Sequence, residues 1–262
     1  MKKIKAIFID FDWTIYDHNT HSIPPSTIFA LNKAKANGVK LFLNSARTYY
    51  SLLGKDIINL VDFDAYGVIN GCASFNKQEI IHSHFIEDED AKEIISICKN
   101  NHLSYLVSTL ANTYIDVIPN DPLVKEFYKA FAETYPLDIS LYDQKEKLVV
   151  IQVFYKKEDD YLFEHLKNRL SSHRFFDYTV EFNEVDNYKQ EATNAIMNYY
   201  HLAKEDCMAL GDDLNDIDMF HSVGTSVCMG NGNEEAKKNA SYITANIEDD
   251  GIYKALEHFK VI

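Results

Sequence analysis

The chain contains 262 residues, which is enough for one large α/β domain or for two domains. Hydrophobic residues make up 46% of it, so the chain can bury a substantial core and is not globally disordered. The formal net charge of −14 argues against a nucleic-acid partner, because the phosphates would be repelled, but it leaves room for a small anionic substrate whose charge is neutralised locally.

The beginning of the chain predicts a cytoplasmic protein. Residues 1–5 lead directly into an apolar segment, without the longer apolar block and cleavage site of a signal peptide. No apolar run approaches the roughly 20 residues of a membrane span, so we expect no membrane partner. The four cysteines lie far apart and form no C-x-x-C pair, which favours buried free thiols over a structural zinc site.

The first predicted strand covers residues 6–9 and ends on two carboxylates. Four consecutive apolar residues are typical of a strand that is buried on both faces. Asp10 and Asp12 follow it, at the strand end where open α/β sheets keep their ligands. Two anions this close would repel each other, so they indicate a shared cation. A polar strand end turning into a loop is the alternative interpretation.

Two further strands are predicted before residue 84. A helix begins near Pro25 and ends at Gly38, and a buried strand over residues 39–43 follows it. That strand ends at Ser45, whose hydroxyl could donate to a phosphoryl oxygen or cap a helix, and the two roles are compatible. A third strand over residues 65–69 ends on a turn that begins at Asn70.

Residues 84–183 are predicted to form an inserted second domain. Its texture differs from that of the flanking chain, because strands with alternating polar and apolar residues replace the short apolar strands. We expect an α+β sheet with helices on one side. The predicted helices cover residues 87–101, 121–135 and 158–170, and the predicted strands cover residues 103–108, 113–118, 148–155 and 178–182.

After the insert, the chain returns to strands that alternate with helices. This spacing predicts a doubly wound parallel sheet, Rossmann-like in class, assembled from residues 1–83 and 184–262. The predicted helices here cover residues 189–200 and 251–259, and the predicted strands cover residues 207–210, 226–229 and 242–244.

Polar residues that suit phosphoryl transfer recur at this predicted sheet edge. Carboxylate and carbonyl oxygens are hard ligands that Mg²⁺ prefers, and a lysine and a hydroxyl can hold a transferring phosphoryl group. One carboxylate can attack phosphorus while a second moves the proton. Taken singly, Lys189 could be a solvated helix residue, and Asp216 could be a helix-start charge. The full set is Asp10, Asp12, Ser45, Lys189, Asp212, Asn215 and Asp216.

These motifs, in this order, resemble the haloacid dehalogenase (HAD) superfamily of phosphohydrolases. More narrowly, the chain resembles the Cof-type sugar phosphatases that carry a class IIB cap, and the resemblance covers essentially its whole length. The pairing of D-x-D-x-T with G-D-x-x-N-D carries most of the specificity. The matching segments are 10–14, 45–47, 70–71, Lys189, 211–216 and 227–231.

The resemblance implies a role for each matching residue. Asp10 would be the nucleophile and Asp12 the general acid and base, with Ser45 and Lys189 assisting catalysis. Mg²⁺ would be held by the Asp10 carboxylate, the Asp12 carbonyl and Asp212, and Asp216 would act through water or a neighbouring ligand. The phosphate and substrate would contact the main chain of Phe11 and Ala46 and the side chains of Ser45, Arg47, Asn70, Lys189 and Asn215.

The chain departs from the family pattern at several glycines. Glycine is usual where this sequence has Trp13, Ala46 and Gln190, and glycine serves where the backbone needs a positive φ or close approach. The Trp13 indole could narrow the leaving-group pocket, provide a stacking surface, or accompany weakened catalysis. Every residue with direct chemistry is retained.

The sequence therefore predicts a Mg²⁺-dependent phosphatase that acts on a small phosphorylated metabolite, with a sugar phosphate favoured. The insert would be a cap that excludes water and selects the leaving group. The alternatives are a phosphomutase of the same superfamily and a phosphometabolite-binding protein with weakened catalysis. The leaving group and the oligomeric state are left open.

Overall fold

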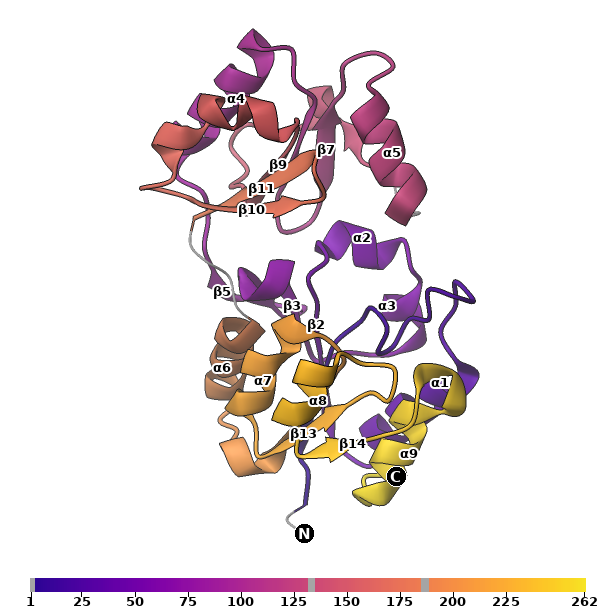
Figure 1. The fold of residues 1–262 in the computed structure, drawn as a ribbon. Helices are drawn as coiled ribbons and strands as arrows, with labels where there is room; N and C mark the ends of the chain where they lie inside the picture. The colour runs from indigo at the N-terminus through magenta and orange to yellow at the C-terminus, as the bar shows by residue number, and fades with distance from the viewer. Residues whose placement is uncertain (1–2, 132–134, 185–188) are drawn as a thin grey trace. The chain divides into compact units, whose positions relative to one another are not determined.

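The computed structural model describes residues 3–131, 135–184 and 189–262, which belong to two compact units (Figure 1). Unit 1 contains Met1–Arg47, Lys55–His82 and Asn187–Ile262. Unit 2 contains Thr48–Gly54 and Ser83–Asp186. The chain therefore leaves unit 1 after His82 and returns to it more than 100 residues later.

Unit 1 is organised around an eight-stranded sheet with the order β14-β13-β12-β1-β2-β3-β4-β5. Neighbouring strands are parallel from β14 to β3, and β4 is antiparallel to β3. Parallel strands joined through helices confirm the predicted doubly wound α/β class. The strands are β1 (Ala6–Ile9), β2 (Lys40–Asn44), β3 (Ala65–Val68), β4 (Ala73–Phe75), β5 (Ile80–Ser83), β12 (Cys207–Gly211), β13 (Thr225–Cys228) and β14 (Tyr242–Ile243).

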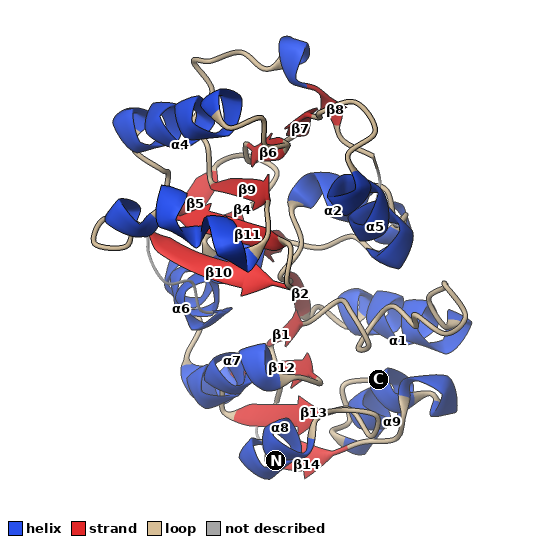
Figure 2. Ribbon diagram, turned by 45° about the horizontal axis from the view of Figure 1, so that its top comes forward, coloured by secondary structure: helices blue, strands red, loops and turns tan. Residues whose placement is uncertain are grey.

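Helices cover both faces of this sheet. Figures 1 and 2 show α6, α7 and α8 on one face and α1 and α9 on the other. On the first face, Phe8 and Phe42 pack in a buried cluster with Ile196 and Met219 from the helices. Burial on both sides explains why β1 is wholly apolar. The helices of unit 1 are α1 (Pro25–Ala36), α3 (Ile57–Leu60), α6 (Lys189–Tyr199), α7 (Ile217–Ser222), α8 (Glu234–Asn239) and α9 (Gly251–His258).

Unit 2 contains a six-stranded sheet with the order β10-β11-β9-β6-β7-β8. Its strands pair antiparallel, except that β7 and β8 are parallel. The strands are β6 (Tyr105–Ser108), β7 (Thr113–Asp116), β8 (Leu137–Asp138), β9 (Val150–Phe154), β10 (Ser171–Phe175) and β11 (Thr179–Asn183). The helices are α2 (Tyr49–Leu53), α4 (Asp88–Asn100) and α5 (Pro122–Phe131).

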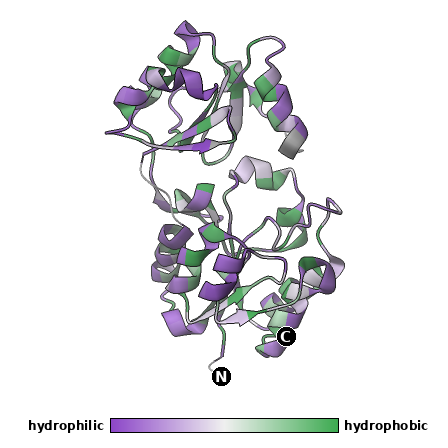
Figure 3. Cartoon of the chain, viewed as in Figure 1, coloured by the Kyte–Doolittle hydropathy of each residue, from purple (hydrophilic) through white to green (hydrophobic). Residues whose placement is uncertain are grey.

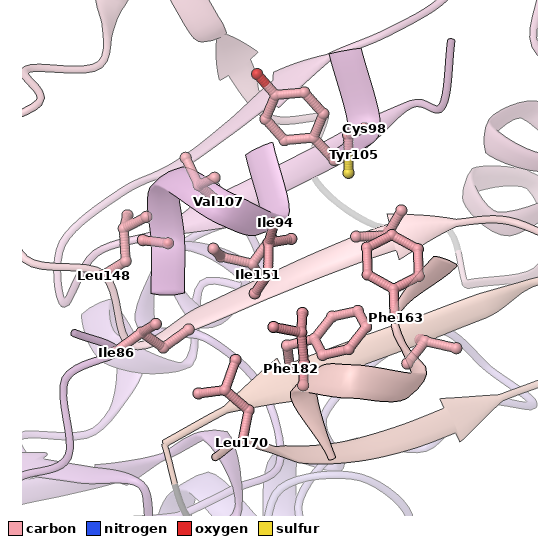
Figure 4. Close-up of a cluster of buried hydrophobic side chains, with 14 of the residues drawn as sticks. Ile86, Ile94, Cys98, Tyr105, Val107, Leu148, Ile151, Phe163, Leu170 and Phe182 are labelled. Atoms are coloured by element: carbon pink, nitrogen blue, oxygen red, sulfur yellow. The ribbon is translucent and has the colours of Figure 1, made fainter. Parts of the chain in front are cut away.

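The prediction that helices lie on one side of this second sheet is wrong. Figure 4 shows Ile94 of α4 packed with Ile151 and Phe182 on one face. The next residues along the strands point the other way, and Leu106 and Phe154 pack with α5 in a separate cluster. The unit 2 sheet therefore has two apolar faces, and α4 covers one of them while α5 covers the other.

The predicted helix over residues 158–170 is also wrong. This segment forms two 3₁₀ helices, Lys157–Leu162 and Glu164–Leu166, followed by strand β10. Phe163 and Leu166 are buried three residues apart, and the amide of Leu166 donates to the carbonyl of Phe163 over 3.0 Å. A three-residue repeat suits the 3₁₀ geometry, so the apolar spacing was compatible with both helix types.

The four cysteines are buried and free, as predicted. In the described ranges, no helix combines the length and the apolar composition needed to cross a membrane. Figure 3 shows hydrophilic and hydrophobic residues side by side on the same helices, as expected for helices that cover a sheet with one face.

Candidate active site

Two adjacent parallel strands, β1 and β12, bring the predicted acidic residues to one edge of the unit 1 sheet. Strand β1 lies between β12 and β2, and all three are parallel. Ile9 pairs with Leu210 on one side and with Leu43 on the other, so these strands end in register. Asp10 follows β1 and Asp212 follows β12. The two carboxylates therefore start from adjacent strand ends, which is the usual ligand position in an open α/β sheet.

Lys189, the first residue of α6, connects two of the predicted acids. Its Nζ donates to Oδ1 of Asp10 over 2.5 Å and to Oδ1 of Asp216 over 2.6 Å. The Lys189 side chain is 0% exposed. Burial lowers the pKa of Lys189, but the charges and hydrogen bonds of the two carboxylates outweigh burial and raise the pKa above its ordinary value. Lys189 is therefore a buried cation shared by two acids.

Backbone groups fix the position of Asp216. Its Oδ2 accepts hydrogen bonds from the amides of Asp212, over 2.9 Å, and Asp213, over 3.1 Å. Gly211 makes room for it, since a Cβ at Gly211 would lie 2.4 Å from Cγ of Asp216. Both oxygens of Asp216 thus accept from protein donors. This suits a residue that positions Lys189 and the Asp212 backbone and does not itself bind a ligand directly.

Three buried acids converge on this edge of the sheet. Asp10, Asp212 and Asp216 each offer one oxygen, and these oxygens lie within 4.8 Å of one another. Burial raises the pKa of Asp10, with Lys189 opposing the rise and the neighbouring acids adding to it. Burial and then the charge of Asp216 raise the pKa of Asp212 to about 7. One lysine does not neutralise three carboxylates, so this donor set fits a hard divalent cation such as Mg²⁺.

Thr14 fixes the Asp212 carboxylate. Its hydroxyl donates to Oδ1 of Asp212 over 3.0 Å, and Thr14 is fully buried. This residue ends the D-x-D-x-T motif, and its contact with Asp212 is not among the roles predicted from the sequence. The signal that could have identified it is its fixed place in the D-x-D-x-T motif.

Asp12 is held by a guanidinium and an imidazole. Arg47 Nε donates to Asp12 Oδ2 over 2.8 Å, and Arg47 Nη2 donates to Oδ1 over 2.7 Å. His18 Nε2 lies 2.6 Å from the same Oδ1. Burial acts to raise the pKa of Asp12, but hydrogen bonds from His18 and Arg47 outweigh burial and lower the pKa to about 2. Asp12 is therefore a carboxylate in this arrangement.

The segment after β2 is shaped by backbone hydrogen bonds. Ser45 is buried, its hydroxyl accepts from the amide of Arg47 over 3.1 Å, and its own amide donates to Gly67. Ser45 does not cap a helix, because Thr48 is the N-cap of α2 and accepts from the amide of Ser51. The Ser45 hydroxyl thus stabilises the turn that carries Arg47 to Asp12.

Asn215 and Asn70 meet at the surface of unit 1. The Asn215 amide donates to Oδ1 of Asn70 over 2.9 Å. Asn70 lies in a left-handed stretch, with φ of 53° at Ile69, 49° at Asn70 and 93° at Gly71. Asparagine tolerates this conformation better than most residues, which explains its place in the turn.

Phe11 and Ala46, the two residues predicted to contact the phosphate through the main chain, differ in exposure to solvent. The Phe11 ring is fully buried and stacks on Tyr16 with 5.4 Å between ring centroids. The carbonyl of Phe11 accepts from the amides of Ile15 and Tyr16, which closes the loop after β1. Ala46 is exposed on the loop after β2. Both residues were predicted to act through their main chains, and neither has a polar side chain.

Trp13 occupies a backbone conformation that favours glycine. Its φ is 58°, in the left-handed region, and its side chain is 37% exposed. Its amide donates to the carbonyl of Tyr16, and its carbonyl accepts from Nδ2 of Asn231 over 2.9 Å. Glycine would meet this backbone requirement without strain, and this chain meets it with tryptophan.

Comparisons with known proteins identify a family model, solved structures and a curated relative that match nearly the whole chain. The family model for haloacid dehalogenase-like hydrolases matches residues 7–256. A solved HAD subclass IIB sugar phosphatase, BT4131, is 28% identical, with a TM-score of 0.75 over 98% of this chain and 100% of its own. A hypothetical protein of Geobacillus kaustophilus shares the fold, with a TM-score of 0.88 at 22% identity over 99% of this chain and 100% of its own. Phosphoglycolate phosphatase 1 of Saccharolobus solfataricus is 25% identical over 95% of this chain and 92% of its own.

The family match covers most of unit 1 and all of unit 2, and it includes every strand end that contributes an acid to the site. The chain belongs to the haloacid dehalogenase-like hydrolases.

Proposed function

We propose that this protein is a Mg²⁺-dependent phosphatase that hydrolyses a small phosphorylated metabolite, with a sugar phosphate as the favoured substrate. The observation that carries the proposal is the buried Lys189 that bridges Asp10 and Asp216, with Asp212 beside them. The phosphatase names of two full-length relatives support the reaction, and the sugar phosphatase among them supports the substrate class.

Asp10 is the proposed nucleophile. A carboxylate oxygen of Asp10 attacks phosphorus, a P–O bond to Asp10 forms, and the bond to the leaving oxygen breaks. Lys189 stabilises the negative charge on the transferring group, because its ammonium is buried and already positioned. Water then attacks the aspartyl-phosphate, releasing inorganic phosphate and restoring Asp10.

Asp12 is the proposed general acid and base. It gives a proton to the leaving oxygen and later takes one from the attacking water. Hydrogen bonds from His18 and Arg47 keep Asp12 ionised here, so the acid role requires that at least one of these hydrogen bonds be lost. We propose that phosphate oxygens draw the Arg47 guanidinium toward themselves, since guanidinium binds phosphate and carboxylate by the same paired geometry. The pKa of Asp12 then rises as the substrate binds.

The remaining predicted residues complete the proposed site. Mg²⁺, held by the carboxylates of Asp10 and Asp212 and the carbonyl of Asp12, would supply charge neutralisation at the phosphoryl group. Asp216 would position Asp212 and Lys189 through its hydrogen bonds to them. The main-chain amides of Phe11 and Ala46, with Ser45, Asn70 and Asn215, would contact the phosphate or the leaving group.

Residues 84–183, which make up most of unit 2, are the proposed cap domain, and residues 1–83 and 184–262 are the proposed catalytic core. A cap excludes water during phosphoryl transfer and contacts the part of the substrate that leaves. We also propose a cytoplasmic location, where small phosphorylated metabolites are available.

Release of inorganic phosphate from a panel of phosphorylated sugars, nucleotides, pyridoxal phosphate and flavin mononucleotide tests the proposal. We expect Mg²⁺-dependent turnover that Asp10→Asn abolishes, whereas Asp62→Asn, at an exposed acid of unit 1, leaves it intact. Formation of a hexose phosphate isomer without phosphate release would indicate a phosphomutase instead. Binding of esters without turnover across the whole panel would contradict the proposed activity.

A further inference from the structure

The position of Trp13 calls for a functional reason, since its backbone conformation disfavours it. A φ of 58° is common for glycine and tolerable for asparagine, but a bulky residue adopts it rarely. Such conformations persist where the surrounding structure holds them, and they gather at active sites and ligand contacts. Glycine would satisfy the backbone here without strain, so the indole itself is the feature to explain.

Contacts on both sides hold the Trp13 backbone. Its amide donates to the carbonyl of Tyr16 over 2.9 Å, within the loop after β1. Its carbonyl accepts from Nδ2 of Asn231, and Oδ1 of the same asparagine accepts from the amide of Ile247 over 2.8 Å. The position of the indole is thus set by two loops that follow two different strands.

The indole stands next to the proposed general acid. Its ring centroid lies 5.0 Å from that of His18, with 37° between the ring planes. His18 in turn contacts Oδ1 of Asp12 at 2.6 Å. Phe11, on the other side of Asp12 in the sequence, is fully buried, whereas Trp13 remains 37% exposed. Part of the indole is therefore exposed next to the residue that would protonate the leaving oxygen.

We propose that Trp13 is a specificity-determining residue whose exposed indole stacks on a ring in the leaving group. The inference rests on the proposed phosphatase function and specifies its substrate as a phosphate ester with a ring. Aromatic side chains present an electron-rich face, and the apolar C–H face of a sugar ring or the face of a heterocycle packs against it. An acyclic leaving group gains much less from the same surface.

Three substitutions at Trp13 test this assignment. Trp13→Gly and Trp13→Asn keep the left-handed backbone accessible and remove the aromatic surface, whereas Trp13→Phe keeps an aromatic ring. The measured quantity is kcat/KM for glucose 6-phosphate divided by kcat/KM for glycerol 3-phosphate. We expect Trp13→Gly and Trp13→Asn to lower this ratio by about tenfold, because they remove an apolar contact that only the ring substrate makes. Trp13→Phe should retain most of the ratio. Thermal unfolding of each variant serves as the folding control.

Trp13 is the single tryptophan of the chain, so its fluorescence reports on this position alone. In Asp10→Asn, which we expect to bind esters without turnover, glucose 6-phosphate should change the emission in a saturable way. Inorganic phosphate and glycerol 3-phosphate should change it little. A ratio that stays within twofold of the parent in Gly and Asn, or emission that ignores glucose 6-phosphate, would overturn the stacking role.

The two proposals fail in different ways. Phosphate release with an unchanged substrate ratio leaves the phosphatase standing and removes the role of Trp13. Absence of phosphate release from every ester, combined with a saturable change in emission, removes the phosphatase and keeps the indole as a ring-binding surface. A Trp13→Gly variant that is faster on both esters indicates a steric barrier and overturns the stacking role.

Discussion

Replacing Lys189 with methionine should both destabilise the protein and slow it. Lys189→Met keeps the length and apolar stem of the side chain but removes the ammonium that lies 2.5 Å from Asp10 and 2.6 Å from Asp216. Breaking a buried ion pair from one side costs about 3–5 kcal/mol, because the partner charges stay buried without compensation. The rate should fall on the order of 10²–10³, since the lost contact is one that stabilises the transferring charge.

The destabilisation should depend on pH in a defined direction. Lys189 opposes the upward shift of the Asp10 pKa, so its removal raises that pKa further. A folded-state pKa above the unfolded value of 3.8 gives stability that is present at low pH and is lost as the pH rises through the folded pKa. The difference in the free energy of unfolding between Lys189→Met and the parent should therefore be largest near neutral pH and should shrink as the pH falls.

Urea unfolding with and without Mg²⁺ measures this effect, and phosphate release measures the rate. Because Mg²⁺ would neutralise the same acids, it should recover part of the lost stability, up to about 2.7 kcal/mol at a hundredfold excess over its Kd. Lys238→Met is the control, since Lys238 pairs with Glu235 on the surface of α8 and should leave the unfolding midpoint unchanged. A Lys189→Met protein with parental stability and rate would refute the buried bridge.

Three further substitutions probe the rest of the site. Arg47→Ala removes one of the two groups that lower the pKa of Asp12 and leaves His18 in place, so it should lower the free energy of unfolding by about 1–2 kcal/mol at neutral pH. This loss should fade as the pH drops from 3.8 toward 2, which acid titration of unfolding can follow. Gly211→Ala would place a Cβ 2.4 Å from Asp216 Cγ, so it should cost about 1–3 kcal/mol in thermal unfolding and lower the rate, and an unchanged melting temperature would contradict the contact. Asn231→Ala removes the hydrogen bonds to the Trp13 carbonyl and the Ile247 amide, so it should cost about 1 kcal/mol and alter the Trp13 emission, and an identical spectrum would show that the loop is held otherwise.

Much of the site could be predicted because the ends of buried strands are recognisable in the sequence as short apolar runs followed by polar residues. Asp10 and Asp212 each follow a short apolar run, and parallel neighbours place such residues at one edge. Lys189 begins a predicted helix, and the structure places it between Asp10 and Asp216. The fold class followed from the same alternation of strands and helices.

Other features depend on contacts that no local pattern encodes. Nothing near His18 marks it as a partner of Asp12, since the contact depends on how the loop after β1 folds back. The paired geometry of Arg47 on Asp12 joins two loops that are 35 residues apart. The departure at Trp13 was visible in the sequence, but its left-handed backbone and its contact with His18 were not.

Two errors in unit 2 have a common origin. The apolar spacing of Phe163 and Leu166 suits both an α-helix and a 3₁₀ helix, so pattern alone could not separate them. Leu106 and Phe154 alternate with residues of the opposite face, and they are covered by α5, which lies between these two residues in the sequence. Tertiary packing decided both outcomes.

The most direct test of the central claim is to trap the phosphorylated residue. Asp12→Asn should slow the second step, and borohydride reduction of the quenched reaction converts an aspartyl-phosphate into homoserine, which peptide mass spectrometry locates. The account predicts homoserine at position 10 after mixing with Mg²⁺ and a substrate. Phosphate release with no modification at Asp10, or with the modification at another carboxylate, would contradict it.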